Sequence, residues 1–425
     1  MFESTAENRT NVFRKLFSGY EGPAFAVRFW DGWTWCSSQS AKPHCIIVLN
    51  NAHALRRLAG APSEITLGEA FIHGDVDLEG DPFSVFAPAE YLLNRPRTVA
   101  QRVLEKLANA AFGAGQWLRH GALNSLRRDR ASIAYHYDQP LAFYRPWLGP
   151  SMVYSCAYFR SDKDSLDDAQ LQKLDLICRK LRLEPGERFL DVGCGWGSLA
   201  LEAARRDAVA HGITLSREQA EAAQRRIEEA GNGNSCRVEL RDYRSMEDVG
   251  QQFDKMASVG MYEHVGLKNL PLYFRIAYRL LRPGGLFLNH GIARAYNSPL
   301  PQSSFVSRYV FPGGDLVTLS EAIAAAESQG FEVRDVECLR EHYELTLRRW
   351  VQGLREHAGE LMKHVSTVTY RIWLLYMAGS AATFQRGDIG VYQLLLSKPD
   401  RGKTRLPLTR EDLYAESKKQ EALVV

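Results

Sequence analysis

A glycine-rich stretch spanning residues 189–199, FLDVGCGWGSL, has the residues best suited to holding a ligand. A short apolar segment ends in Asp191, and glycines follow at alternate positions, Gly193, Gly195 and Gly197. Glycine lets a ligand lie directly against the main chain because it has no side chain. Such a loop, between a first parallel strand and a helix, marks the nucleotide-cofactor crevice of a doubly wound α/β sheet.

The spacing of this loop is G-x-G-x-G, which differs from the dinucleotide-binding pattern G-x-G-x-x-G. With an acidic residue two positions before the first glycine, it is typical of the S-adenosylmethionine loop of class I methyltransferases. A tight turn without a ligand is the alternative that the loop alone leaves open. We therefore expect an α/β protein with a class I methyltransferase doubly wound sheet and S-adenosylmethionine as cofactor.

Two later segments extend the predicted cofactor site. The second predicted strand ends in HGITLSREQ without an acidic residue, so Thr214 and Gln219 are expected to bind the ribose and methionine end by hydrogen bonds. Asp242 and Tyr243 follow the third predicted strand, the usual position for residues that contact the edge and face of adenine.

Reactive side chains recur at other predicted strand ends and just before the sheet, where catalytic groups of open α/β folds collect. They are Cys156 in MVYSCAYF, Glu263 and His264 in GMYEHVG, His290 in FLNHGI, and Tyr343 in REHYELTL. A single buried histidine or tyrosine is usually a packing residue. The set as a whole predicts catalysis.

The elements that must position these residues alternate between helix and strand from about residue 133, which indicates a parallel sheet. Before them, AFAVRFW and CIIVL predict strands and NAHALRRLAG a helix, so a smaller α+β domain comes first. A chain of 425 residues suits two domains. We predict an N-terminal domain over 1–110, a basic linker over 111–132, a methyltransferase domain over 133–400 and a charged tail over 401–425.

Composition narrows the class of protein. The seven cysteines form no C-x-x-C pair, so neither a disulfide framework nor a metal site is expected. The N-terminus lacks the apolar run of a signal peptide, and no stretch is long and apolar enough to span a membrane. The segment from Arg95 to Arg130 has eight basic and two acidic residues, which predicts either a solvated helix face or attraction to an anionic membrane surface.

These motifs together resemble the cyclopropane fatty acid synthases and mycolic acid cyclopropane synthases. MVYSCAYF, LDVGCGWGSLA, HGITLSREQ, YEHVG, LLRPGGLFLNHGI, YVFPGG and HYELTLRRW match the family in order over about residues 133–400. The resemblance implies bicarbonate beside the transferred methyl group, held by Cys156, Glu263, His290, Tyr343 and the main chain of Ile292. The cofactor residues that it implies are Tyr154, Ser155, Asp191, Gly193, Gly195, Thr214, Leu215, Gln219, Asp242 and Tyr243.

The resemblance also implies the reaction. The expected enzyme adds a methylene group across a cis double bond of an unsaturated phospholipid acyl chain, through a carbocation that bicarbonate deprotonates. Two alternatives stay open: a 10-methylene branched product, and a non-catalytic lipid-binding protein. We expect a cytoplasmic, peripherally membrane-associated homodimer. We do not expect it to bind nucleic acid, because the N-P-P-Y-like and paired-cysteine motifs of nucleic-acid methyltransferases are missing.

One segment departs from the family pattern. The family usually has HYDxGNDFY or HYDxSNDFY before the site, whereas this chain has HYDQPLAFY. Gln139, Pro140, Leu141 and Ala142 thus replace small polar residues, while His136, Tyr137 and Tyr144 are kept. We expect this change to affect cofactor affinity, lid motion or product choice.

Overall fold

The computed structural model describes residues 6–59, 62–95, 139–246, 250–297, 304–311 and 315–414. The chain folds into two compact units, each assembled from separate segments. Unit 1 comprises residues 1–148, 297–314 and 343–389, and unit 2 comprises residues 149–296, 315–342 and 390–425. Of the predicted basic segment from Arg95 to Arg130, only Arg95 is among the described residues.

Unit 1 begins with the small α+β body that the sequence predicts. Its four-stranded sheet has the order β2-β1-β3-β4, with β1 parallel to β3 and β3 antiparallel to β4. Gly32, in the predicted turn between β1 and β2, has a φ of +86°. The elements are α1 (Ala6–Leu16), β1 (Phe25–Arg28), β2 (Thr34–Cys36), β3 (Cys45–Leu49), α2 (Ala52–Ala59), α3 (Glu64–Ile72), β4 (Val76–Gly80) and α4 (Phe86–Leu93).

The rest of unit 1 is helical. It holds α7 (Leu141–Leu148), α12 (Phe305–Tyr309), α15 (Ala358–Leu361), α16 (Thr367–Arg386) and most of α14 (Arg340–Glu356). The helix α12 packs on α3 so closely that a Cβ on Gly68 would lie 2.4 Å from the Phe305 ring. Arg371 of α16 pairs with Asp77 of β4 at 2.6 Å, which ties the long helix to the small sheet.

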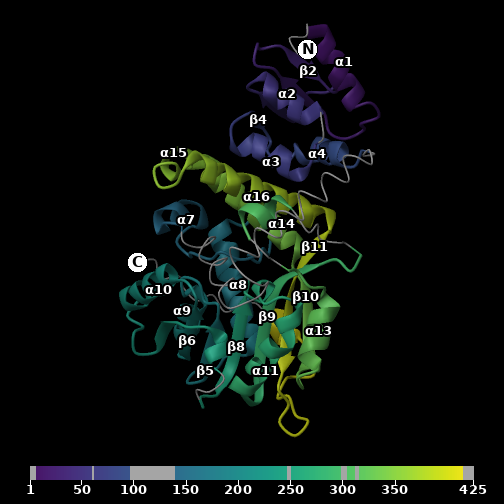
Figure 1. The fold of residues 1–425 in the computed structure, drawn as a ribbon. Coiled ribbons are helices and arrows are strands. Elements are labelled where there is room, and N and C mark those ends of the chain that lie inside the picture. Colours follow the sequence, from purple (N-terminus) through teal and green to yellow (C-terminus); the bar gives the residue numbers. More distant parts are fainter. Residues whose placement is uncertain are drawn as a thin grey trace. The chain divides into compact units, whose positions relative to one another are not determined.

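Unit 2 is built on a seven-stranded sheet with the order β10-β11-β9-β8-β5-β6-β7 (Figure 1). The strands from β7 to β9 pair in parallel, while β10 pairs antiparallel with β11. The strands are β5 (Arg188–Val192), β6 (Val209–Thr214), β7 (Cys236–Leu240), β8 (Phe253–Val259), β9 (Leu281–Arg294), β10 (Glu332–Cys338) and β11 (Ile389–Ser397). The predicted α/β fold is confirmed.

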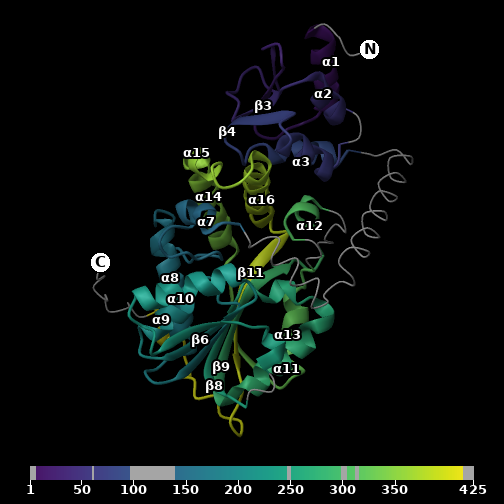
Figure 2. The same cartoon turned by 60° about the vertical axis from the view of Figure 1, so that its left-hand side comes forward.

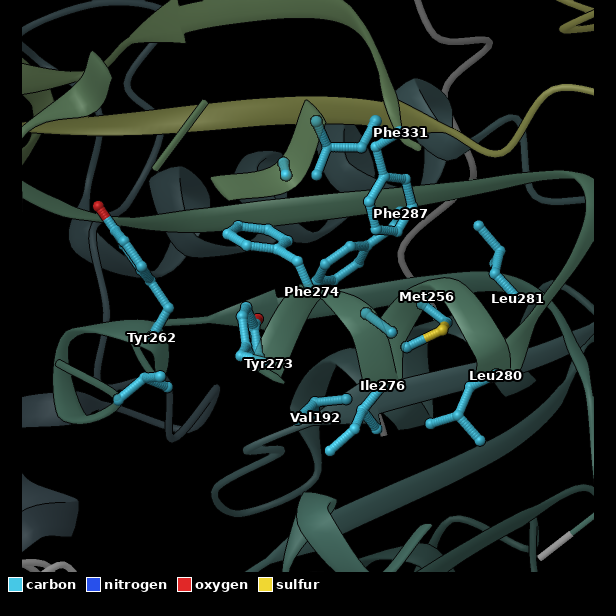
Figure 3. Close-up of a cluster of buried hydrophobic side chains, with 14 of the residues drawn as sticks. Val192, Met256, Tyr262, Tyr273, Phe274, Ile276, Leu280, Leu281, Phe287 and Phe331 are labelled. Carbon is cyan, nitrogen blue, oxygen red and sulfur yellow. The ribbon is translucent and has the colours of Figure 1, made fainter. Parts of the chain in front are cut away.

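Helices cover both faces of this sheet, as the two views show (Figures 1 and 2). One face packs against α8 (Leu166–Leu181), α9 (Ser198–Ala204) and α10 (Arg217–Glu229). The other packs against α11 (Leu270–Leu280) and α13 (Leu319–Glu327). On that second face Phe274, Phe287 and Phe331 pack together at the centre of an apolar cluster (Figure 3). Burying each aromatic side chain contributes about 1.5–3 kcal/mol, so the two faces hold the sheet rigid.

The order of the strands determines where a ligand can bind. The chain passes from β5 to β6 and β7 on one side, and then crosses to β8 and β9 on the other side of β5. The carboxyl ends of β5 and β8 therefore border a topological switch point, where open α/β sheets bind ligands. The loop after β5 and the single-turn helices η1 (Tyr243–Met246), η2 (Tyr262–His264) and η3 (Leu267–Asn269) follow strands at this edge.

Candidate active site

The glycine loop after β5 has the backbone that a close-lying ligand requires. Gly193, Gly195 and Gly197 have φ values of +79°, +54° and +80°, which side-chain-bearing residues rarely adopt. A Cβ on Gly193 would lie 2.9 Å from the Cβ of Met261, so this glycine allows packing within the protein. A Cβ on Gly195 would have no atom within 4 Å. The open space at Gly195 fits the cofactor that the motif predicts.

The residues predicted for the ribose and methionine end lie together after β6. Thr214 donates its hydroxyl hydrogen to Oε1 of Gln219 at 2.8 Å, and both side chains are buried. Ser216 caps α10 by accepting the Gln219 N–H at 3.3 Å, which orients this helix start. The hydrogen bond and the helix cap thus hold the two side chains in one arrangement. Leu215, between them in the chain, is half-buried.

Asp242 and Tyr243, predicted for adenine, are engaged by a residue that the sequence did not single out. Arg244 donates to both carboxylate oxygens of Asp242, at 3.0 and 2.9 Å. Its guanidinium lies 5.3 Å from the centre of the Tyr243 ring. Arg244 therefore contacts both residues that the sequence predicts for adenine.

Near the end of β9, two adjacent residues of η2 hold the main chain of one residue, Ile292, on both sides of its Cα. The Ile292 N–H donates to Oε1 of Glu263 at 2.8 Å, and the Tyr262 hydroxyl donates to the Ile292 carbonyl at 2.9 Å. Tyr262 stands at the end of the apolar cluster in Figure 3. A Cβ on Gly291 would lie 2.0 Å from the Tyr262 ring and 3.1 Å from Cδ of Glu263, so the arrangement needs glycine there. The family resemblance implies that the main chain of Ile292 holds an anion, whereas here its N–H donates to Glu263.

His290 is buried at 1% exposure and is oriented from β11. The Gln393 amide nitrogen lies 3.1 Å from Nδ1 of His290. Because an amide NH₂ only donates, Nδ1 accepts and the ring proton lies on Nε2. Burial and the nearby charges of Lys173 and Lys180 hold the pKa of His290 well below its usual value, so the ring is neutral.

Several buried polar atoms in this region, Gln393 Oε1 among them, have no hydrogen-bond partner among the described residues, and two of these atoms belong to the predicted catalytic set. They are Nε2 of His290 and Oε2 of Glu263. Burial raises the pKa of Glu263 to about 7. A neutral donor and a carboxyl group that titrates near neutrality could together orient a small oxyanion and exchange a proton with it.

The loop with Tyr154, Ser155 and Cys156 lies beside the same strand ends. A Cβ on Gly260, the residue after β8, would lie 4.0 Å from the Ser155 Cβ, and the Gly260 N–H donates to the His290 carbonyl at 2.9 Å. Cys156 is fully buried, with its thiol 3.7 Å from the Leu339 carbonyl. Tyr154 is half-buried.

Tyr343 belongs to unit 1, whereas the other predicted catalytic residues belong to unit 2. Its ring packs against Phe384, with 4.7 Å between ring centres, and meets Trp350 edge-on. Unit 1 also contains a pocket of about 140 Å³ that includes Gln139 of the altered loop. Its other lining residues are Tyr309, Val310, Thr369, Ile372, Trp373 and Tyr376.

Sequence reasoning missed Gln393, Lys173 and Arg244. Gln393 interrupts the apolar strand IGVYQLLLS, and Lys173 falls on the apolar stripe of the helix predicted over 166–183. A polar residue at a core position was the signal available for both. Arg244 had no such signal, because it follows Asp242 in an ordinary polar loop.

Solved structures share this architecture. The cyclopropane synthase MmaA2 from Mycobacterium tuberculosis is 32% identical, with a TM-score of 0.60, covering 63% of this chain and 97% of that one. The mycolic acid cyclopropane synthase CmaA1, complexed with SAH and CTAB, is 34% identical, with a TM-score of 0.59 and the same coverages. The sheet order and the glycine loop thus define a class I S-adenosylmethionine-dependent methyltransferase fold.

Sequence comparison is more specific. Residues 124–394 match the family described as mycolic acid cyclopropane synthetase, and residues 12–89 match a domain of unknown function, DUF7884. A probable fatty acid methyltransferase of Pseudomonas putida is 40% identical over 91% of this chain and 95% of its own length. The cyclopropane-fatty-acyl-phospholipid synthase of Escherichia coli K12 is 38% identical, and the match covers 62% of this chain and 66% of the length of that enzyme. The chain belongs to the mycolic acid cyclopropane synthetase family.

Proposed function

We propose that this protein transfers a methylene group from S-adenosylmethionine to the cis double bond of an unsaturated phospholipid acyl chain, forming a cyclopropane ring. The observation that carries the proposal is the pair of buried atoms without partners, Glu263 Oε2 and His290 Nε2, at the carboxyl end of β9. The glycine loop is next to them, since Gly193 contacts Met261, two residues before Glu263. Family membership supports the same chemistry.

The chemistry explains why such a pair is useful. S-adenosylmethionine, when bound, supplies an electrophilic methyl group, and bicarbonate supplies a small base that is not part of the protein. An isolated alkene is a weak, neutral nucleophile and becomes a carbocation on attack. The ring closes only if a proton leaves the newly added methyl group, so a base must be held against that carbon.

The residues of this chain would hold and poise that base. His290 would hold an oxygen of the anion through Nε2, and its ring is neutral because its pKa is well below the usual value. Glu263 would accept the O–H of bicarbonate through Oε2, and its pKa of about 7 would let it exchange a proton near neutral pH. Ile292 contributes by fixing Glu263 through its N–H. Cys156 and Tyr343 enter the proposed set from the family resemblance.

The proposed cofactor site lies on the other side of Met261. Gly193 and Gly195 present their main chain, and Thr214 and Gln219 present a preorganised pair. The other members are Tyr154, Ser155, Asp191, Leu215, Asp242 and Tyr243.

On the lipid side, the proposal gives the N-terminal domain over 1–110 a role in lipid binding and the basic linker over 111–132 a role at an anionic membrane surface. The pocket beside Gln139, with Trp373 and Tyr376, has the aromatic lining that an acyl chain would contact. None of the helices in the described part of the chain is both long and apolar enough to cross a membrane. A cytoplasmic, membrane-associated homodimer completes the proposal.

A 10-methylene branched product is the second candidate. Relatives in Pseudomonas putida and Mycobacterium tuberculosis are described as probable fatty acid methyltransferases, a description that names no product and is compatible with either outcome. A hydride shift would move the positive charge to the methylated carbon, and loss of a proton from the added methyl group would then form the exocyclic double bond, so the position of the acyl chain relative to the base decides the outcome. The altered residues 139–142 could shift that position.

Product analysis tests the proposal. The purified protein is incubated with S-adenosylmethionine, bicarbonate and vesicles of a cis-monounsaturated phospholipid, and the acyl chains are analysed by mass spectrometry. A product heavier by one CH₂ group that resists mild hydrogenation is a ring. Uptake of one molecule of hydrogen shows a methylene branch. Cofactor binding without turnover would instead favour a non-catalytic lipid-binding protein.

A further inference from the structure

Lys173 is a buried lysine that the proposed chemistry does not use. Lys173 lies on the inner face of α8 and is only 2% exposed. Its ammonium group donates to Oγ of Ser155 at 3.0 Å. Ser155 stands between Tyr154 and Cys156, so the contact reaches the loop that borders both proposed ligands.

The other buried lysines of unit 2 have carboxylate partners. Lys180 pairs with Glu337 and lies 3.8 Å from Asp335, and Lys255 lies 3.7 Å from Glu187. Among the described residues, no carboxylate lies within 4 Å of the Lys173 ammonium. A buried ammonium that lacks a close counter-ion is costly, so its retention in this position indicates a role other than stability.

Helix α8 holds the loop at two points, one turn apart. The amide nitrogen of Gln170, which is fully buried, donates to the Ser155 carbonyl at 3.0 Å and lies 3.4 Å from the Val153 carbonyl. Lys173 holds the side chain of the same serine. The helix itself starts at an N-cap, Ser165, whose hydroxyl accepts the Asp168 N–H. The loop therefore has a rigid support.

Lys173 also acts on Asp191, the acidic residue at the end of β5. Asp191 is 2% exposed, and burial raises its pKa to about 7 while the charge of Lys173 opposes that rise. Burial lowers the pKa of Lys173 to about 8, and the charges of Cys156 and Asp191 oppose that fall. The two residues thus stabilise each other's charged forms.

The titratable groups of neighbouring elements that act on this pair include three buried thiols and His290. Burial raises the thiol pKa of Cys178 on α8 and of Cys236 on β7 to about 12, and that of Cys194 in the glycine loop still further. His290 on β9 is neutral because its pKa is well below the usual value. Cys156 contributes its thiol beside Ser155, and Lys180 lies two turns along α8.

We propose that Lys173 is a positioning residue for cofactor binding, which ties the Tyr154–Cys156 loop to α8 and brings a buried positive charge to that loop. The proposal rests on the proposed function, in that the glycine loop is taken to bind an S-adenosyl group. Its effect is electrostatic as well as structural, so it predicts a change in the pH dependence of binding. A purely structural lysine would not produce that change.

The test is calorimetric titration of the full-length protein with S-adenosylhomocysteine between about pH 6 and pH 9, where Asp191 titrates. Lys173→Met removes the charge and the hydrogen bond, Lys173→Gln keeps a donor without the charge, and Ser155→Ala removes the bond but keeps the charge. Lys255→Met is the matched control, because Lys255 is a buried lysine near the start of β8, away from the crevice.

Both Lys173 variants should bind several-fold more weakly near pH 7 and recover affinity at higher pH, because loss of the lysine charge raises the pKa of Asp191. Ser155→Ala should weaken binding without moving its pH dependence, and Lys255→Met should leave both unchanged. Wild-type pH dependence in folded Lys173→Met or Lys173→Gln overturns the proposal. If neither folds, unchanged affinity in Ser155→Ala overturns it. Absence of binding to the wild-type protein would refute the proposed function itself.

Discussion

Replacing Gly195 by valine should weaken cofactor binding while leaving the protein folded. Gly195 has a φ of +54°, and a Cβ there would meet no atom within 4 Å. The folding cost is therefore limited to the left-handed backbone, about 1–2 kcal/mol for a residue with a side chain. In the complex, the branched side chain would occupy the space of the ligand. Overpacking of about 1–3 kcal/mol corresponds to an affinity loss of roughly five- to 150-fold.

Gly186 provides the matched control. It also has a left-handed φ, +77°, and its Cβ would also meet no atom within 4 Å, but it precedes β5 and lies at the opposite end of that strand. Gly186→Val should therefore lower the midpoint of denaturant unfolding as much as Gly195→Val does. Calorimetric titration with S-adenosylhomocysteine then separates the two variants. Equal affinity of the Gly195 variant and the wild-type protein would show that this loop does not hold the cofactor.

Four further predictions address the rest of the molecule. Activity should fall in carbonate-depleted buffer and return when bicarbonate is added, and equal rates with and without bicarbonate would point to a protein base. Glu263→Gln should depress turnover far more than cofactor affinity. Initial rates at saturating bicarbonate should rise with pH through about 7. Burial raises the pKa of Glu263 to about 7, and at lower pH the protonated carboxyl group cannot accept the O–H of bicarbonate. A rate that does not change with pH would contradict the role of Glu263 as acceptor. Gly291→Ala should lower the unfolding free energy by about 1–3 kcal/mol and reduce activity, since its Cβ would clash with Tyr262, whereas Gly359→Ala, with open space around it, should unfold like the wild type. Reversing the charges of the arginines at 127, 128 and 130 should weaken pelleting with anionic vesicles, by about 1 kcal/mol per lost charge and less at high salt. Vesicle binding that changes neither with the charge reversal nor with salt would show that the segment has another role.

Local sequence patterns were sufficient for the fold and for the position of the cofactor loop. The alternation of helix and strand predicts the parallel sheet, and the left-handed φ values of Gly193, Gly195 and Gly197 are those that the glycine spacing requires. The strand ends at Thr214 and His290 are also visible as apolar runs followed by polar residues. These features depend on neighbours in the chain, which is why one sequence is enough to find them.

The partners of the site residues could not be predicted in this way. Gln393 orients His290 from more than a hundred residues away, and Arg244 engages Asp242 through a side-chain conformation that no pattern encodes. The commitment of the Ile292 N–H to Glu263 likewise depends on how closely η2 approaches β9. Long-range pairing and side-chain rotamers decide these contacts.

The sequence by itself determined the class of protein, because a glycine loop, a helix–strand rhythm and reactive residues at strand ends are local and periodic properties. The tertiary structure alone decided which of those residues are charged, which are neutral and which atoms remain without a partner. Burial sets the pKa values of Glu263, Asp191 and Lys173, and burial exists only after distant segments pack together. The chemistry of the site is therefore a property of the packed fold.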